Sequence, residues 1–176
     1  FGGWYEMLFN LGKTAHQHWS LTQTGVTNSH FPRSGEIQFF AQSFTPPTVL
    51  EWAANGAGRW TDVGSWSPAG SPNSGDQTAV FGSHANITET TTAVVNEAVT
   101  VGRIEFNNAT HVYAIAGTGS IDLAADSAGG FPSVDVQAGS HEFQVRTNLQ
   151  ADTFLKVATG QSLAFNHRLN LNGRTL

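Results

Sequence analysis

The sequence predicts an all-β protein built from short strands that are separated by glycine-containing turns. Charged residues make up only 12% of the chain, against about 25% in an ordinary globular domain, and helix surfaces normally carry such residues. Apolar and polar residues alternate along many short segments, which is the period of a strand with one buried face. Gly119, Gly139 and Gly160 follow one another at intervals of 20 and 21 residues. This interval lies in the range of solenoid repeats.

Periodicity alone leaves two all-β architectures open. The step from Gly160 to Gly173 is only 13 residues, so the repeat is not regular. An antiparallel β-sandwich also places a strand every ~8–12 residues. A parallel β-solenoid (β-helix) and a sandwich therefore both fit the spacing.

Residues 1–50 are predicted to form an extended N-terminal arm, with at most a short helix near residues 5–11. Pro46 and Pro47 close this segment, because two consecutive prolines stiffen the backbone and cannot donate ladder hydrogen bonds. Nine of the 19 aromatic residues of the chain fall in it. They are Phe1, Trp4, Tyr5, Phe9, Trp19, Phe31, Phe39, Phe40 and Phe44.

Residues 51–176 are predicted to form the β domain. Its lead-in, residues 52–76, is rich in glycine and proline and contains Trp60 and Trp66. We expect these two side chains to pin the lead-in onto the core, because an indole offers a large apolar area with one polar group. Short strands are predicted from Thr78 onward. The structural turn glycines among them are Gly119, Gly139, Gly160 and Gly173.

Charge and composition exclude several classes of partner. The net charge is −5, and eight Lys and Arg residues are spread singly, whereas nucleic-acid binding needs clustered cations. No apolar run approaches the ~18–20 residues of a membrane-spanning helix. The chain contains no cysteine, which is compatible with a secreted bacterial protein. It begins at Phe1 without a signal-peptide pattern, so we expect either that a leader has been removed or that the chain is part of a longer product.

Chemical motifs are weak throughout, and we predict no enzyme activity, no cofactor and no metal. His16 and His18 lie two residues apart, but only the distant His30 offers a third ligand, and metal sites need three or four. Carboxylates are scattered and are interpreted as ordinary turn and surface residues; stacking of Asp122 and Glu142 across turns, as an acid–base pair, is the less favoured alternative. The glycosylation sequons at residues 86–88 and 108–110 are interpreted as chance matches.

Several segments of residues 52–176 resemble the autotransporter-associated β-strand repeat proteins and related PEP-CTERM-type exoproteins of bacteria. The similar segments are Gly58-Arg59-Trp60, Trp66, Pro72-Asn73, Asp76, Ala79–Gly82, Val99–Asn108, Tyr113–Ile121, Val134–His141 and Leu169–Leu176. The resemblance implies a right-handed parallel β-solenoid that is secreted and has a structural or adhesive role, with no catalytic residues to carry over. It favours the solenoid over the sandwich. The aromatic arm has no counterpart in the family.

The arm leads to a hypothesis about function. A solenoid has two ends with open strand edges, and an extended segment with alternating apolar residues is suited to add to such an edge. We therefore predict a protein of the extracellular space or cell surface that assembles with itself, head to tail, into a filament. Docking of the arm onto its own solenoid, as a cap, is left open by the sequence. A surface adhesin or carbohydrate-binding module, with glycans as partners, is the alternative. The predicted subunit-interface residues are Phe1, Trp4, Tyr5, Phe9, Trp19, Phe39, Phe40 and Leu176.

Overall fold

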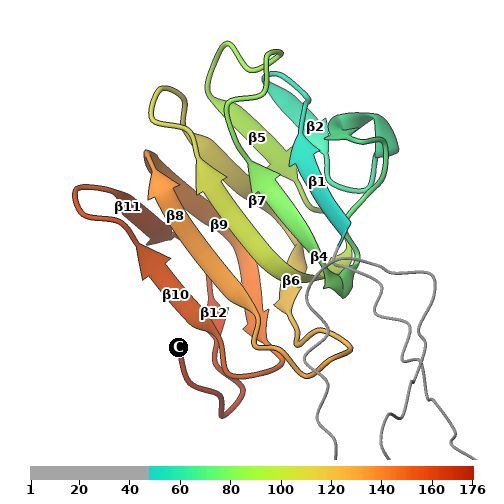
Figure 1. Ribbon diagram of the computed structural model, residues 1–176, viewed down its shortest axis with the longest axis vertical. Coiled ribbons are helices and arrows are strands. Elements are labelled where there is room, and N and C mark those ends of the chain that lie inside the picture. The colour runs from blue at the N-terminus through green and yellow to red at the C-terminus, as the bar shows by residue number, and fades with distance from the viewer. Residues whose placement is uncertain (1–47) are drawn as a thin grey trace, which may run out of the picture. The chain divides into compact units, whose positions relative to one another are not determined.

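Residues 48–176 are described by a computed structural model, and they coil into a parallel β-solenoid of about five turns (Figure 1). The prediction of an all-β solenoid is confirmed. The sandwich alternative is wrong, because the strands of successive turns pair in parallel and the only antiparallel pair within residues 48–176 joins β1 to β3. The first strand begins at Thr48, so the solenoid includes residues 48–50, although the sequence places the end of the arm at residue 50.

Each turn contributes strand segments to three sheets. The first sheet contains β1 (Thr48–Trp52), β4 (Ser74–Phe81), β6 (Ala98–Asn107), β8 (Ser133–Ala138) and β10 (Phe154–Val157). The second contains β2 (Ala57–Arg59), β5 (Thr91–Val94), β7 (Tyr113–Leu123), β9 (Ser140–Leu149) and β11 (Ser162–Phe165). The third is formed by parts of β6, β7 and β9 together with β12 (Leu169–Asn170). The short β3 (Trp66–Ser67) and the 3-10 helix η1 (Val63–Ser65) lie outside this repeat.

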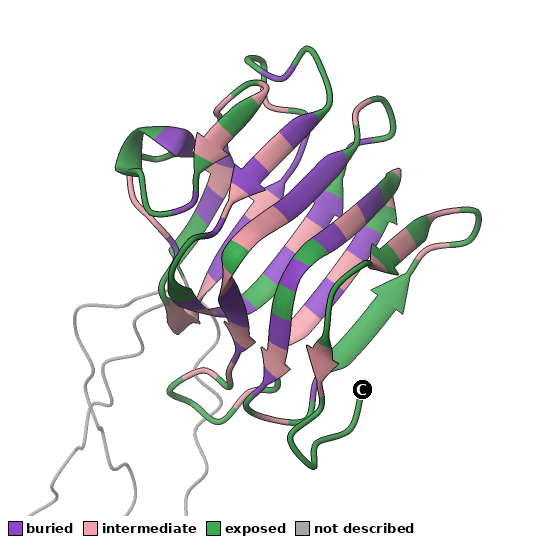
Figure 2. Ribbon diagram, turned by 180° about the vertical axis from the view of Figure 1, so that it is seen from behind, coloured by how far each residue is buried: buried purple, intermediate pink, exposed green. Residues whose placement is uncertain are grey.

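The core is a set of apolar columns that run along the solenoid axis. In the first sheet Leu50, Ala79, Ile104 and Val134 occupy equivalent positions in successive turns, and all four are buried. The alternation of buried and exposed residues along each strand gives the striped pattern in Figure 2. The period-2 pattern of the sequence therefore reports which side chains point inward.

Glycine is required where the chain turns from one sheet to the next. β6 bends at Gly102, and its two halves pair with different strands, β7 before the bend and β8 after it. A Cβ atom on Gly102 would overlap the carbonyl oxygen of Gly75 in the preceding turn. Such close approach of two backbones leaves no room for a side chain.

We predict that Gly102→Ala lowers the free energy of unfolding by about 3 kcal/mol, because backbone atoms must shift to admit the methyl group. Gly64→Ala is the matched control, since its Cβ would have an ordinary 3.4 Å contact with Asp62 Oδ1. Urea unfolding followed by circular dichroism measures both. Equal stability of the two variants would show that the turns do not approach as closely as the fold requires.

Candidate functional site: the two ends of the solenoid

The N-terminal end of the solenoid is closed by a cluster of tryptophans. Trp52, Trp60 and Trp66 are almost fully buried, and the ring of Trp66 lies 4.9 Å from the ring centres of both other indoles. Every indole N–H has a partner: Trp60 donates to the Pro72 carbonyl, Trp66 to the Trp60 carbonyl and Trp52 to the Ala54 carbonyl, each at 2.7 Å. Trp60 and Trp66 are therefore part of the core and bond the backbone of the lead-in.

Part of the edge of the first strand is covered as well. β3 runs antiparallel to β1, with Trp66 opposite Trp52 and Ser67 opposite Glu51, and the Ala53 amide donates to the Ser65 carbonyl at 2.8 Å. Where the two strands pair, β1 offers no free edge for another chain, whereas the pairing does not extend to residues 48–50. This end of the stack, with β1, β2 and η1, lies opposite the end with β10 and β11 (Figure 1).

Within residues 48–176, no comparable cluster or strand covers the last turn. Leu155 and Val157 continue the columns of Val134 and Val136, yet they are 37% and 40% exposed while the residues above them are buried. Phe165 stacks on the buried Phe143 with ring centres 5.0 Å apart, but is itself only partly buried. Figure 2 shows the exposed and intermediate residues of this last turn near the C-terminus. The core-facing side chains of the last turn therefore form an apolar surface that is exposed at this end of the solenoid axis.

Residues 171–176 begin a further turn. The Thr153 amide donates to the Thr175 carbonyl at 3.0 Å, and the Thr175 amide donates to Asp152 Oδ1 at 2.9 Å. Hydrogen bonds from the backbone and side chain of Thr175 hold the pKa of Asp152 below its ordinary value. Leu176, a predicted interface residue, is 48% exposed beside this turn. The other predicted interface residues, Phe1, Trp4, Tyr5, Phe9, Trp19, Phe39 and Phe40, lie outside the described residues.

A ladder of amides also runs toward the open end. On the third sheet Asn148 Nδ2 donates to Asp122 Oδ1 at 2.6 Å, and Asn170 Nδ2 donates to Asn148 Oδ1 at 2.7 Å. Glu142 lies on the second sheet instead, opposite Ala114. Asp122 and Glu142 are therefore not brought together, and the acid–base pair that the sequence suggested does not form.

The predicted turn glycines all lie at turns or bends. Gly139, Gly160 and Gly173 have φ angles of +93°, +79° and +75°, which L-residues rarely adopt. A Cβ on Gly119 would overlap the backbone of Glu97 in the neighbouring turn. Each of the four thus has a structural reason to be glycine.

Other features of the sequence are placed by the fold. Asn108, in one sequon, is 3% exposed, and its side chain bonds the Gly82 carbonyl and the amides of Thr110 and His111. It is inaccessible to a glycosyltransferase in the folded protein.

Within residues 48–176 no three His, Cys, Asp or Glu side chains cluster as metal ligands, while His16, His18 and His30 lie outside that range. No helix in the same range is long and apolar enough to cross a membrane.

Residues 48–176 form a parallel β-solenoid whose first turn carries a buried tryptophan cluster and whose last turn exposes apolar side chains. Comparisons with protein-family models, with curated proteins and with solved structures found no match. The resemblance to autotransporter-associated repeat proteins stays a prediction from the motifs.

His141 is a buried polar residue that the sequence reasoning missed. It occupies an inward position of β9, two residues before Phe143, and its ring stacks on Phe106 at 4.7 Å. Its Nδ1 accepts from the Tyr113 amide at 3.1 Å, so the neutral ring carries its proton on Nε2, 2.8 Å from the Ala138 carbonyl. Burial lowers the pKa of His141, and the hydrogen bond to Ala138 opposes that change in part.

We predict that His141 makes stability depend on pH. In the unfolded chain the His141 imidazole takes up a proton at pH ~6.5, whereas in the folded chain it does so only at lower pH. The contribution of neutral His141 to the free energy of unfolding is therefore complete above pH ~6.5. It is lost as pH falls through the lowered pKa of the folded state. His141→Gln keeps a donor and an acceptor but cannot titrate, so its stability should fall less between about pH 7.5 and 5. Urea unfolding across this range measures the difference, with the exposed His167→Gln as control. Parallel curves for the wild type and His141→Gln would contradict the assignment.

Proposed function

We propose that this chain is a secreted structural subunit that assembles head to tail into an extracellular filament. The N-terminal arm of one copy adds to the open end of the next. The observation that supports this most directly is the exposed apolar face of the last turn, with Leu155, Val157 and Phe165 at its surface. No chemical step is involved, because the function is to extend a stack of turns.

The closed end explains why an arm is needed. The tryptophan cluster and the pairing of β3 with Glu51 and Trp52 hinder direct stacking of one solenoid on another. A strand from outside residues 48–176 is therefore better suited to extend the last turn. Residues 1–47 of a second copy are suited to this role, because they contain nine aromatic residues and only four charged ones.

Physical chemistry favours several anchors over one. Burial of an aromatic side chain contributes ~2–3 kcal/mol, while ordering the arm costs ~1–2 kcal/mol per residue and association carries its own entropy cost. One aromatic residue cannot offset these costs. Binding of the arm therefore needs several aromatic anchors, such as Trp4, Phe9 and Phe39, together with the backbone hydrogen bonds of an added strand.

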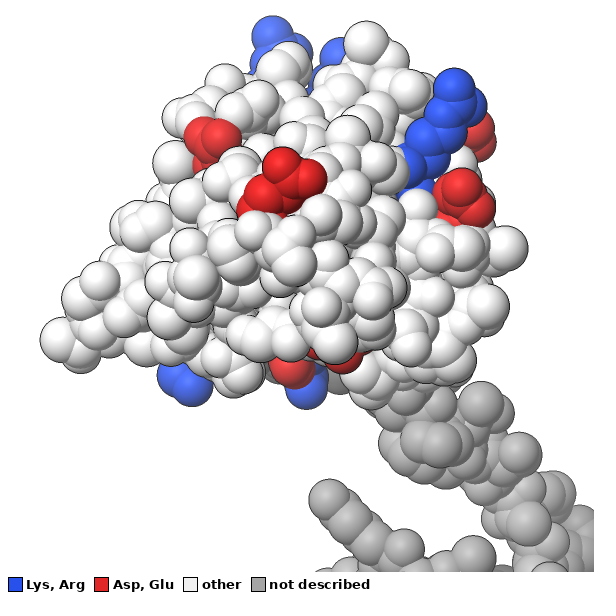
Figure 3. Space-filling model, turned by 90° about the horizontal axis from the view of Figure 1, so that it is seen from above, with Lys and Arg blue, Asp and Glu red and all other residues white. Residues whose placement is uncertain are grey.

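The charge distribution is compatible with close association of copies. Figure 3 shows one face on which a few charged side chains are surrounded by uncharged ones. Sparse charge weakens the repulsion that keeps proteins apart. The extracellular location belongs to the proposal, and rests on the absence of cysteine and on the family resemblance.

We predict that Phe165→Asp in the full chain abolishes filaments, because it places a carboxylate in the apolar face that receives the arm. Ser162→Asp adds the same charge to the same strand at an exposed position and should still polymerise. Negative-stain electron microscopy and analytical ultracentrifugation distinguish the two. If the wild-type chain stays monomeric at high concentration, the filament proposal is wrong and the adhesin alternative takes its place.

A second experiment decides which molecule supplies the arm. Phe39 is replaced by the photo-crosslinking residue p-benzoylphenylalanine, and this protein is mixed with a nitrogen-15-labelled wild-type chain. We expect crosslinks from the unlabelled arm to labelled residues 154–176, detected by mass spectrometry. The same group at Val63, which is 58% exposed at the closed end, is the control. Crosslinks confined to one copy would show that the arm caps its own solenoid.

A further inference from the structure

A groove lies on the outer face of the first sheet, across β6, β8 and the last strand β10. It has a volume of about 270 Å³ and crosses three neighbouring strands. The strand register sets its side chains in two rows: Arg103, Ser133 and Phe154 form one, and Glu105, Asp135 and Lys156 form the other.

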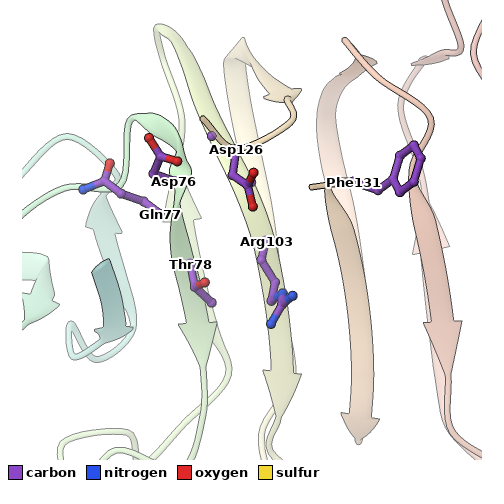
Figure 4. A pocket seen from close by; sticks show the side chains of 8 residues that line it. Asp76, Gln77, Thr78, Arg103, Asp126 and Phe131 are labelled. Carbon is purple, nitrogen blue, oxygen red and sulfur yellow. The ribbon is translucent and has the colours of Figure 1, made fainter. Parts of the chain in front are cut away.

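An aromatic pair borders this groove. Phe154 is 64% exposed and Phe131, from the loop that precedes β8, is 57% exposed. Their ring centres are 5.4 Å apart and the rings are nearly perpendicular. Phe131 and Arg103 also line a smaller hollow with Asp76 and Asp126, and Figure 4 shows Arg103 and Asp126 between Asp76 and Phe131. The two hollows therefore adjoin.

The groove is balanced in charge. Arg103 lies 3.8 Å from Glu105, and Lys156 lies 3.6 Å from Asp135. Two cations and two carboxylates give no net charge, so neither a polyanion nor a polycation is favoured. Asp135 Oδ1 is shielded from solvent and has no hydrogen-bond partner among residues 48–176, so a ligand reaches this acceptor only if the side chain turns toward the groove. A ligand with neutral hydroxyl groups can satisfy both kinds of charged group, because a hydroxyl both donates and accepts.

The aromatic pair adds a second requirement. An aromatic face carries negative charge density and a large apolar area, and it attracts groups with weakly positive hydrogens. A pyranose ring meets this requirement, since its faces carry C–H groups and its rim carries hydroxyls. A peptide strand fits less well, because β8 already pairs with β6 and β10 and has no backbone groups free to bind it.

We propose that this groove binds a segment of a neutral polysaccharide. Phe131 and Phe154 pack against sugar rings, and Asp135, Glu105, Arg103 and Lys156 bond their hydroxyls. The volume is near the lower limit of ~300–1,000 Å³ for small-ligand sites, so the enclosed part holds about one ring. The proposal does not depend on filament assembly, since the groove lies within one solenoid.

The test titrates the full chain, by isothermal calorimetry, with hexasaccharides of β-1,4-linked glucose, mannose and N-acetylglucosamine, and with an anionic oligogalacturonate. We expect at least one neutral hexasaccharide to bind and the anionic one to bind more weakly. The double variant Phe131→Ala with Phe154→Ala should weaken binding at least tenfold, and Asp135→Asn should weaken it severalfold. Val63→Ala, an exposed apolar residue at the closed end, should change it less than twofold.

Three results would overturn the proposal. They are the absence of binding by all three neutral sugars, equal affinity in the double variant, and tighter binding of the anionic sugar. Thermal unfolding of each variant checks that the exposed substitutions leave the fold intact. Because the two phenylalanines are mostly exposed, we expect unchanged unfolding midpoints.

Discussion

The stacking of each turn on its neighbour is the interaction on which this structure depends. No turn buries its apolar side chains alone; Ile104 is buried because Ala79 lies on one side and Val134 on the other. The stability of such a stack is roughly a sum of contacts between neighbouring turns. A turn with only one neighbour therefore keeps about half of its apolar contacts. At the two ends, other residues must cover the apolar side chains that a neighbouring turn would otherwise bury.

The two ends meet this constraint differently. At the closed end three indoles and an antiparallel strand fill the space of a missing turn, and each indole N–H has a carbonyl partner. At the open end the repeat simply continues, with Phe165 stacked on Phe143 and Asn170 bonded to Asn148. Apolar columns and amide ladders that continue to the last turn provide a template on which a further turn can form.

Buried polar groups fix the register between turns. The Tyr113 hydroxyl donates to the Gly82 carbonyl at 2.6 Å, and Asn108 Nδ2 donates to the same oxygen at 3.0 Å. Burial raises the pKa of Tyr113 to about 12, so the hydroxyl stays a donor. Because an unpaired buried polar group is costly, a slip of one residue would be penalised at both side chains.

The sequence predicted the strands well because alternation reports inward and outward positions directly. Phe143 and Val145 were placed correctly for that reason, whereas His141 was overlooked, since a histidine at an inward position interrupts an apolar pattern. The sequence did not predict which side chains become neighbours across turns, because this depends on which sheet each segment joins. Asp122 and Glu142 are 20 residues apart, close to the glycine spacing, yet they lie on different sheets because turns differ in length. The groove was missed for a related reason: Arg103, Ser133 and Phe154 are adjacent only through the register of three turns.

The two proposed surfaces would act along different directions. Addition at the open end uses the edges and the axial face of the last turn, whereas the groove lies on the side of the first sheet. Phe154 and Lys156 of the groove belong to β10, but they lie on the outer face of the sheet, so an arm added to the edge of that strand need not cover them. A filament would display identical sugar sites at regular intervals, and once one site is bound, the next binds at a raised effective concentration. A weak site in one subunit would then suffice for firm attachment of the filament, because avidity arises from the repeat and not from the affinity of one groove.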